Sequence, residues 1–158
     1  MAIKAPAKKS TPIKHIPPHN LEAEVAVLGS ILINPESMNK VVEILDIDSF
    51  YSPQNRLIYE AAYILYNQNK PIDYLSISEY FKSRNQLDEI GGIEYLSELG
   101  LDTVLSSNIE YYAQIIKDNA LKRKLVSAGS IIIEEVFKNP EAEASLEIAE
   151  KTIFDIAQ

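Results

Sequence analysis

Hydrophobic residues recur every three or four positions along most of the chain from residue 21 onward, which is the spacing of amphipathic helices. The pattern is clearest in PPHNLEAEVAVLGSIL, residues 17–32, where Asn20 precedes an acidic first turn. Asparagine caps helices and acidic side chains favour their positive ends, so a helix is predicted to begin after Asn20. Its expected buried stripe consists of Leu21, Val25, Leu28 and Leu32.

Further boundary signals divide the first two thirds of the chain into more helices. The pairs NP at 34–35 and SP at 52–53 each place a capping residue before a proline, which suits the first helical position. The segment SISE at 76–79 has the pattern of a capping box, and the glycine pair at 91–92 predicts a joint between helices.

Tyrosines follow one edge of the helix predicted after Pro53. A tyrosine row at helical spacing can form a platform on which nucleic-acid bases stack. Because few cations accompany the row, we expect it to form the rim of the hydrophobic core. Its members are Tyr59, Tyr63 and Tyr66.

The longest periodic run begins at a second capping box, SNIE at 107–110, and continues to about Lys138. The pair NP at 139–140 then breaks the helix. A last helix places Leu146, Ala149, Ile153 and Ile156 on one face. Two consecutive helices joined by a short turn are expected to form an antiparallel hairpin.

The predicted fold is therefore all-α, with a compact multi-helix head followed by a long antiparallel helical hairpin. We place the head at residues 17–105 and the hairpin at 106–158, where it leads towards a linker. Residues 1–16 are expected to be a disordered basic leader.

The long helix carries two apolar stripes. One consists of Leu121, Leu125, Ala128, Ile132 and Val136, and the other of Val126, Ser130, Ile133 and Phe137. A two-helix hairpin needs only one apolar stripe on each helix, so the second stripe must be covered by the head or by another chain. Gly129 weakens the helix by about 1 kcal/mol relative to alanine, which makes sense if another backbone comes close there.

Charge is distributed unevenly along the chain. The net charge is −8, yet residues 1–19 contain four lysines and no acid, so the rest holds 11 basic and 23 acidic side chains. An acidic body repels a phosphate backbone, and little direct nucleic-acid binding is expected. The leader is rich in proline and cannot bury enough apolar surface to fold, although it could touch nucleic acid weakly.

The composition limits the possible chemistry. The chain has no cysteine, and His15 and His19 both fall in or beside the leader, so a zinc site of the usual ligands or a Ser-His-Asp triad is not expected in the body. Carboxylate pairs at 134–135 or at 141 and 143 could hold Mg²⁺, but exposed acids on a helix are more often a solvated face. No P-loop pattern occurs. We predict no catalytic, cofactor or metal site in this chain.

The order of the motifs resembles the N-terminal domain of the bacterial replicative DNA helicase, the DnaB type, over about residues 17–158. The resemblance consists of PPHNLEAEVAVLGSIL, the FY pair at 50–51, PID at 71–73, LDEIGGIEYLSEL, NIEYYAQIIKDNALKRKLVSAG and AEKTIFDIAQ. Two positions depart from the family pattern: Asn55 stands where many members have histidine, and Tyr74 where a smaller aliphatic residue is common.

The resemblance implies a collar in a hexameric ring built as a trimer of dimers. Such a collar docks the C-terminal domain of primase and helps to receive the helicase loader. ATP and Mg²⁺ would be bound by a RecA-like ATPase domain that is absent from this sequence, and the full-length protein would be an ATP-dependent DNA helicase. We therefore interpret the chain as a fragment of a longer protein, acting in the bacterial cytoplasm at the replication fork or, as an alternative, in a plastid stroma.

On this interpretation, the hairpin carries both interaction sites. The predicted oligomer interface consists of Leu125, Ala128, Gly129, Ile132, Val136, Ile148, Ile153 and Ile156. The predicted primase-docking residues are Leu121, Val126 and Ile133. Two other functions stay open: a free-standing helical adaptor that binds a peptide helix in the hairpin groove, and a carboxylate metalloenzyme.

Overall fold

The computed structural model describes residues 15–101 and 108–158, and within them every regular element is helical. The α-helices are α1 (Leu21–Ile33), α2 (Met38–Ile44), α3 (Pro53–Asn67), α4 (Tyr74–Lys82), α5 (Gly92–Leu101), α6 (Ile109–Lys138) and α7 (Ala142–Ala157). Three short 3₁₀ turns lie between them: η1 (Pro35–Ser37), η2 (Ile47–Ser49) and η3 (Asp88–Ile90). The predicted all-α fold is confirmed.

Local capping signals position several of these helices. The Asn20 side chain accepts a hydrogen bond from the Ala23 backbone N–H at 2.9 Å, as predicted. The Ser52 hydroxyl accepts one from the Asn55 N–H at 3.4 Å, and Pro53 takes the first position of α3. Each cap satisfies a backbone donor that the helix itself leaves unpaired.

The capping box predicted at residues 76–79 is wrong. Helix α4 begins earlier, at Tyr74, because Asp73 accepts the Ser76 N–H at 2.7 Å while the Ser76 hydroxyl accepts the Asp73 N–H at 2.8 Å. An aspartate followed three residues later by serine satisfies the same two backbone donors. Of the box predicted at 107–110, Ser107 lies outside the described residues, and Asn108 precedes α6 without a side-chain cap bond.

The head packs around α1, which contacts α3, α5 and α6. Because neighbours surround α1, its buried side is wider than one stripe and includes Ala23, Val27, Leu28 and Ile31. The prediction that Leu21 is buried is wrong, since its side chain is exposed. The edge position predicted for Tyr59 is also wrong: this residue is completely buried, and its hydroxyl donates to the Leu45 carbonyl at 2.9 Å.

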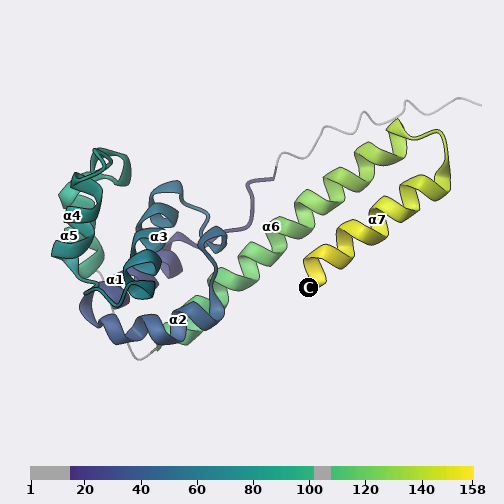
Figure 1. The fold of residues 1–158 in the computed structure, drawn as a ribbon. Helices are drawn as coiled ribbons and strands as arrows, with labels where there is room; N and C mark the ends of the chain where they lie inside the picture. The colour runs from purple at the N-terminus through teal and green to yellow at the C-terminus, as the bar shows by residue number, and fades with distance from the viewer. Residues whose placement is uncertain (1–14, 102–107) are drawn as a thin grey trace, which may run out of the picture.

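Helix α6 takes part in both halves of the molecule (Figure 1). Its first turns belong to the hydrophobic core of the head through Ile109, Ala113 and Ile116. The rest of this 30-residue helix projects from the head, and α7 runs back beside it in the opposite direction. The predicted head–hairpin boundary at 105–106 lies outside the described residues.

Within residues 15–101 and 108–158, no helix combines the length and apolar character that crossing a bilayer requires.

Candidate protein-interaction surfaces

The hairpin exposes large apolar side chains along both of its helices. Phe137, near the end of α6, is 86% exposed and Ile133 is 62% exposed. The other exposed large apolar residues here are Leu121, Leu125, Val126, Ile131, Val136, Leu146, Ile153 and Phe154. Large exposed apolar side chains gathered in one part of a molecule often mark a place where another protein binds.

The inner side of the hairpin is only partly filled. A hollow of about 470 Å³ at its closed end is lined by Ile132, Val136, Asn139, Pro140, Ala142, Ser145, Leu146 and Ala149. Ala128 is 2% exposed, so the chain itself already covers it. The stripe that contains Ala128 and Ile132 therefore faces α7, whereas Val126, Ile133 and Phe137 stay uncovered.

The predicted oligomer-interface residues differ in exposure. Leu125, Val136 and Ile153 are exposed, Gly129, Ile132, Ile148 and Ile156 are half-buried, and Ala128 is buried. A methyl group added at Gly129 would meet nothing within 4 Å beyond its own helical turns, so no other backbone within residues 15–101 and 108–158 approaches there. The three residues predicted for primase docking, Leu121, Val126 and Ile133, are all exposed. Both assignments stay predictions.

The base of the projecting hairpin is held by an arginine. The Arg123 guanidinium donates to the Pro18 carbonyl at 2.8 Å and to the Ser49 carbonyl at 2.7 Å. It also lies 5.5 Å from the ring centre of Tyr51, on which His19 stacks at a centroid distance of 4.2 Å. Burial lowers the pKa of Arg123, with the Glu24 carboxylate acting in the opposite direction. His19 is thus part of the head and not of the leader.

A buried carboxylate organises the start of α3. Glu24 is 1% exposed and accepts hydrogen bonds from the Tyr51 N–H at 3.0 Å, the Ser52 N–H at 3.2 Å and the Asn55 side-chain amide at 3.1 Å. The Tyr95 hydroxyl donates to the Asn55 carbonyl oxygen. Burial raises the pKa of the Tyr95 phenol, although hydrogen bonds to Gln54 and Asn55 oppose this effect. The network ties α1, α3 and α5 together.

The sequence reasoning treated Glu24 only as a favourable charge near a helix start. Its position among apolar residues of α1 is the one local signal that this carboxylate is buried. Its partners lie 27 to 31 residues away, and spacing along one helix cannot identify them.

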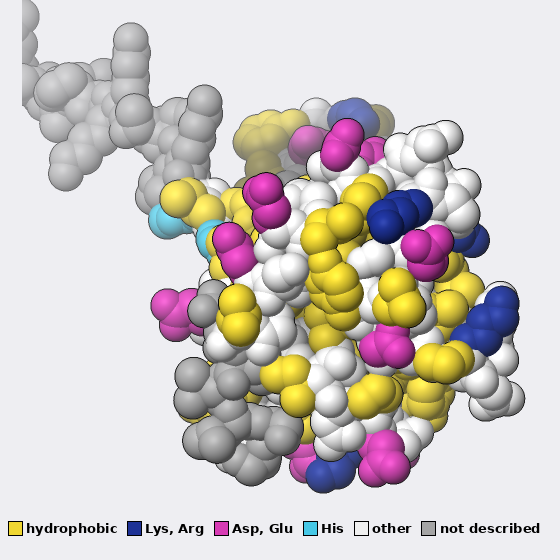
Figure 2. All heavy atoms as spheres, turned by 90° about the vertical axis from the view of Figure 1, so that its left-hand side faces the viewer, with side chains coloured by type: hydrophobic (Ala, Val, Ile, Leu, Met, Phe, Trp, Pro, Cys, Tyr) yellow, Lys and Arg dark blue, Asp and Glu magenta, His cyan; other side chains and the backbone are white. Residues whose placement is uncertain are grey.

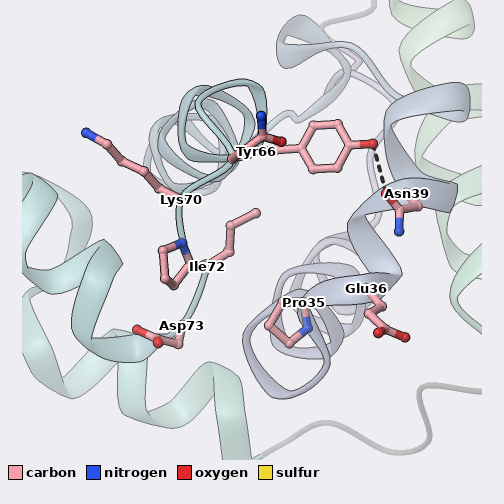
Figure 3. A pocket seen from close by; sticks show the side chains of 9 residues that line it. Pro35, Glu36, Asn39, Tyr66, Lys70, Ile72 and Asp73 are labelled. Atoms are coloured by element: carbon pink, nitrogen blue, oxygen red, sulfur yellow. Dashed lines mark hydrogen bonds between the residues drawn. The ribbon is translucent and has the colours of Figure 1, made fainter.

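A hollow of about 290 Å³ lies in the head between α2, the end of α3 and the start of α4 (Figure 3). Its polar side chains mainly hold the helices together: the Tyr66 hydroxyl donates to the Asn39 side-chain oxygen at 2.8 Å, and Asp73 caps α4. The lining also includes apolar Pro35 and Ile72 and the charged Glu36 and Lys70. This hollow therefore has a structural role in joining α2, α3 and α4.

Figure 2 shows the face of the head opposite the hairpin, where apolar side chains lie between acidic and basic ones. Exposed apolar residues of the head include Leu75 of α4 and Ile93 of α5. Among the described residues, the hairpin exposes more large apolar side chains than the head does, so the hairpin is the stronger candidate surface.

The carboxylates considered as metal ligands, at 134–135 and at 141 and 143, all lie in the hairpin. Glu135 accepts a hydrogen bond from the Asn139 side-chain amide at 2.9 Å, so it helps to end α6. Glu134, Glu141 and Glu143 are exposed. In the described parts of the chain, no group of three or more His, Cys, Asp or Glu residues lies close enough together to hold a metal ion.

The head, the projecting hairpin and its uncovered apolar side chains define the class of this protein: an all-helical interaction domain. The comparison with protein families matches residues 16–118 to the DnaB-like helicase N terminal domain. The chain therefore belongs to the family of DnaB-like helicase N-terminal domains.

Individual relatives agree with the family match. The chain is 38% identical over 159 residues to the replicative DNA helicase DnaB of Haemophilus influenzae, covering 99% of this chain and 34% of the relative. It is 35% identical over 144 residues to the replicative DNA helicase DnaC of Bacillus subtilis, covering 90% of this chain and 32% of the relative. The chain therefore spans about a third of these helicases.

Solved structures show the same fold. The N-terminal domain of the DnaB helicase from Mycobacterium tuberculosis superposes with a TM-score of 0.84 at 32% identity, covering 88% of this chain and 99% of that one. A DnaB-like replicative helicase, described with its interactions with primase, gives a TM-score of 0.73 at 28% identity, covering 87% of this chain and 31% of that one.

Proposed function

We propose that this domain holds the subunits of a hexameric replicative helicase together and docks primase and the helicase loader. The observation that carries the proposal is the exposed apolar surface of the hairpin, in a chain whose family is that of replicative helicases. ATP hydrolysis and DNA unwinding would belong to a RecA-like domain of the longer protein, which would bind ATP and Mg²⁺ during DNA replication in the bacterial cytoplasm.

Two sides of α6 are assigned to two partners. Subunit pairing would use the side around Leu125 and Gly129, where small and apolar residues leave room for a second backbone. Primase docking would use Leu121, Val126 and Ile133, of which Leu121 shares the stripe of Leu125 whereas Val126 and Ile133 belong to the other stripe. The solved DnaB-like replicative helicase is described with its interactions with primase, which supports primase as a partner.

A pair of double variants tests these assignments, and each serves as the control for the other. Leu125→Asp with Gly129→Glu should lower the mass measured by light scattering to that of a monomer while each chain still binds the C-terminal domain of primase. Val126→Asp with Ile133→Asp should leave the mass unchanged and abolish primase binding in calorimetry. All four positions are at least partly exposed, so folding should be retained, and circular dichroism checks this.

If the first double variant lost primase binding and the second became a monomer, the two assignments would be exchanged. If mass and primase binding were unchanged in both variants, the proposal would be contradicted. Loader docking is tested separately by pull-down of the loader with the wild-type chain. Retained loader binding in both double variants would place the loader elsewhere on the domain.

A free-standing adaptor function would be supported instead if the extended reading frame lacked a Walker-type P-loop downstream.

A further inference from the structure

The side of α6 that faces away from α7 carries a straight row of side chains, which we call the outer stripe. Its members are Val126, Ser130, Ile133 and Phe137. Ser130 lies two residues after the buried Ala128, about 200° further around the helix, so the row points away from α7. All members of the outer stripe are exposed. The row is therefore open to a partner along its whole length.

The spacing of the outer stripe is typical of a seam between two packed helices. Its members follow one another at intervals of four, three and four residues. Two helices with this alternation interlock their side chains at a small crossing angle. From Val126 to Phe137 the row is about 17 Å long, which about three turns of a partner helix would cover.

Ser130 leaves a gap in this row between larger side chains. Its hydroxyl donates to the Val126 carbonyl at 3.2 Å, one turn earlier in the same helix. A hydroxyl that is bonded within its own helix loses little when another protein covers it, because no polar group is left unpaired. The gap can therefore take an apolar side chain of a partner, as a hole takes a knob.

A helix fits this row better than an extended segment does. Extended segments bind by hydrogen bonds to an open sheet edge, and every regular element within residues 15–101 and 108–158 is helical. The backbone groups in the middle of α6 are already paired within the helix. Side chains alone must make the contact, and side chains that recur every three or four residues match a second amphipathic helix.

The charges beside the outer stripe favour a basic partner. Glu134 is exposed and follows Ser130 by one turn, so it lies at the edge of the row. Glu141 and Glu143, just beyond the end of α6, are exposed as well. Residues 131–158 contain seven acidic and two basic side chains. A lysine or arginine of the partner would therefore find its complement opposite Glu134.

We infer that the partner on this side of the hairpin presents a basic amphipathic helix of about three turns, which packs along the outer stripe with an apolar side chain over Ser130. This assignment rests on the proposed function, because the partner proposed for Val126 and Ile133 is primase. It names the element of primase that makes the contact, and it adds Ser130 and Glu134 to the residues that determine binding.

The absence of cysteine allows the docked element to be identified by crosslinking. Ser127→Cys and Lys138→Cys, at exposed positions beside the outer stripe, each receive a short photo-crosslinker. The residues that they join in full-length primase are identified by mass spectrometry. The two labels are about 17 Å apart, which a helix covers in about 11 residues and an extended segment in about five. The two crosslinked sites in primase should lie about 11 residues apart.

Each other outcome has a distinct meaning. Crosslinked sites about five residues apart, or in separate segments of primase, would overturn the docked helix while primase docking itself stands. Primase that binds without crosslinks would be docked away from the outer stripe, which also overturns the assignment. Crosslinks to a second copy of this chain would show that a neighbouring subunit occupies the stripe, which contradicts it too. No binding of primase to the wild-type chain in calorimetry would contradict the proposed function itself.

Two exposed serines of α6 test the gap. Ser130→Phe should weaken primase binding roughly tenfold or more, because the larger side chain fills the gap. Ser130→Ala should bind like the wild type. The matched control Ser127→Phe introduces the same side chain outside the outer stripe and should leave the affinity unchanged. Equal affinities of the two phenylalanine variants would remove the role given to Ser130.

Charge reversal tests the basic character of the docked helix. Glu134→Lys should weaken primase binding severalfold and reduce its dependence on salt. Glu147→Lys changes the net charge equally, but Glu147 lies on the outer side of α7, two residues after the buried Ser145. This control should have little effect. Equal losses in both variants would show a general effect of net charge and would contradict a basic group opposite Glu134.

Discussion

Glu24 connects three elements of the head through one buried carboxylate. Its oxygens accept hydrogen bonds from two backbone N–H groups and one side-chain amide, all within residues 51–55. A carboxylate can satisfy several donors at once because it has no hydrogen of its own when ionised.

Glu24→Gln should lower the free energy of unfolding by about 1 to 3 kcal/mol, because the amide nitrogen would face a donor and leave it unsatisfied. Urea denaturation followed by circular dichroism measures the change. The matched control is Glu22→Gln, an exposed position in the same first turn, which should change stability by no more than about 0.5 kcal/mol. Equal effects of the two changes would contradict the role given to Glu24.

Some residues whose partners lie within four positions were predictable, although the box formed by Asp73 and Ser76 was not. Asn20 and Ser52 cap helices by contacting backbone three residues away, and the sequence alone predicts both. Glu24 and Tyr59 depend on contacts 14 to 31 residues away, and helical spacing contains no information about them. Tyr59 was misplaced for this reason: its hydroxyl has a buried carbonyl partner, which removes the usual need for a tyrosine to reach water.

At the scale of single elements, α6 has the most unusual composition, with a glycine in its middle and apolar side chains on several sides. The periodicity predicted its length and the break at Asn139 correctly. It could not predict which stripe faces α7, because both stripes are apolar and the crossing of two helices depends on their packing. The structure shows Ala128 buried and Ile133 exposed.

Gly129→Ala tests whether Gly129 affects only the stability of α6 or also the association of one chain with another. With no atom within 4 Å of the added methyl group, the change should raise the free energy of unfolding of the single chain by up to about 1 kcal/mol. If a second backbone packs against Gly129, the same methyl group should weaken self-association, measured by sedimentation over a range of concentrations. Ser127→Ala, on an exposed part of the same helix, is the control and should leave association unchanged. Unaltered association in Gly129→Ala would remove Gly129 from the predicted interface.

At the scale of the whole molecule, Arg123 brings three separate segments together: residues 17–19, η2 and α6. The charge pattern predicted the acidic body and the basic leader, but not this arginine, since its acceptors are backbone carbonyls that any residue provides. For the same reason the direction of the hairpin relative to the head could not be derived from the sequence.

Arg123→Lys should loosen this junction, because an ammonium group lacks the planar fork that donates to two carbonyls at once. The stability should fall by about 1 to 2 kcal/mol. The ¹H NMR signals of the His19 ring should shift towards those of an unstacked histidine, since Tyr51 would lose its neighbour. Lys124→Arg, at the adjacent exposed position, is the control. Unmoved His19 signals in Arg123→Lys would show that the stack does not need the guanidinium.

Helix α6 runs without a break from the core of the head to the hairpin tip. It therefore acts as a rigid rod that pivots near Arg123. The free arm, from Arg123 to Lys138, is about 22 Å long, so a tilt of roughly 10° displaces its end by about 4 Å. The short arm is embedded among the side chains of the head and has no room to swing by a similar amount. A force applied at the hairpin tip is therefore transmitted to the contacts of α6 with α1 and α2. A partner that binds the tip also fixes the orientation of the head.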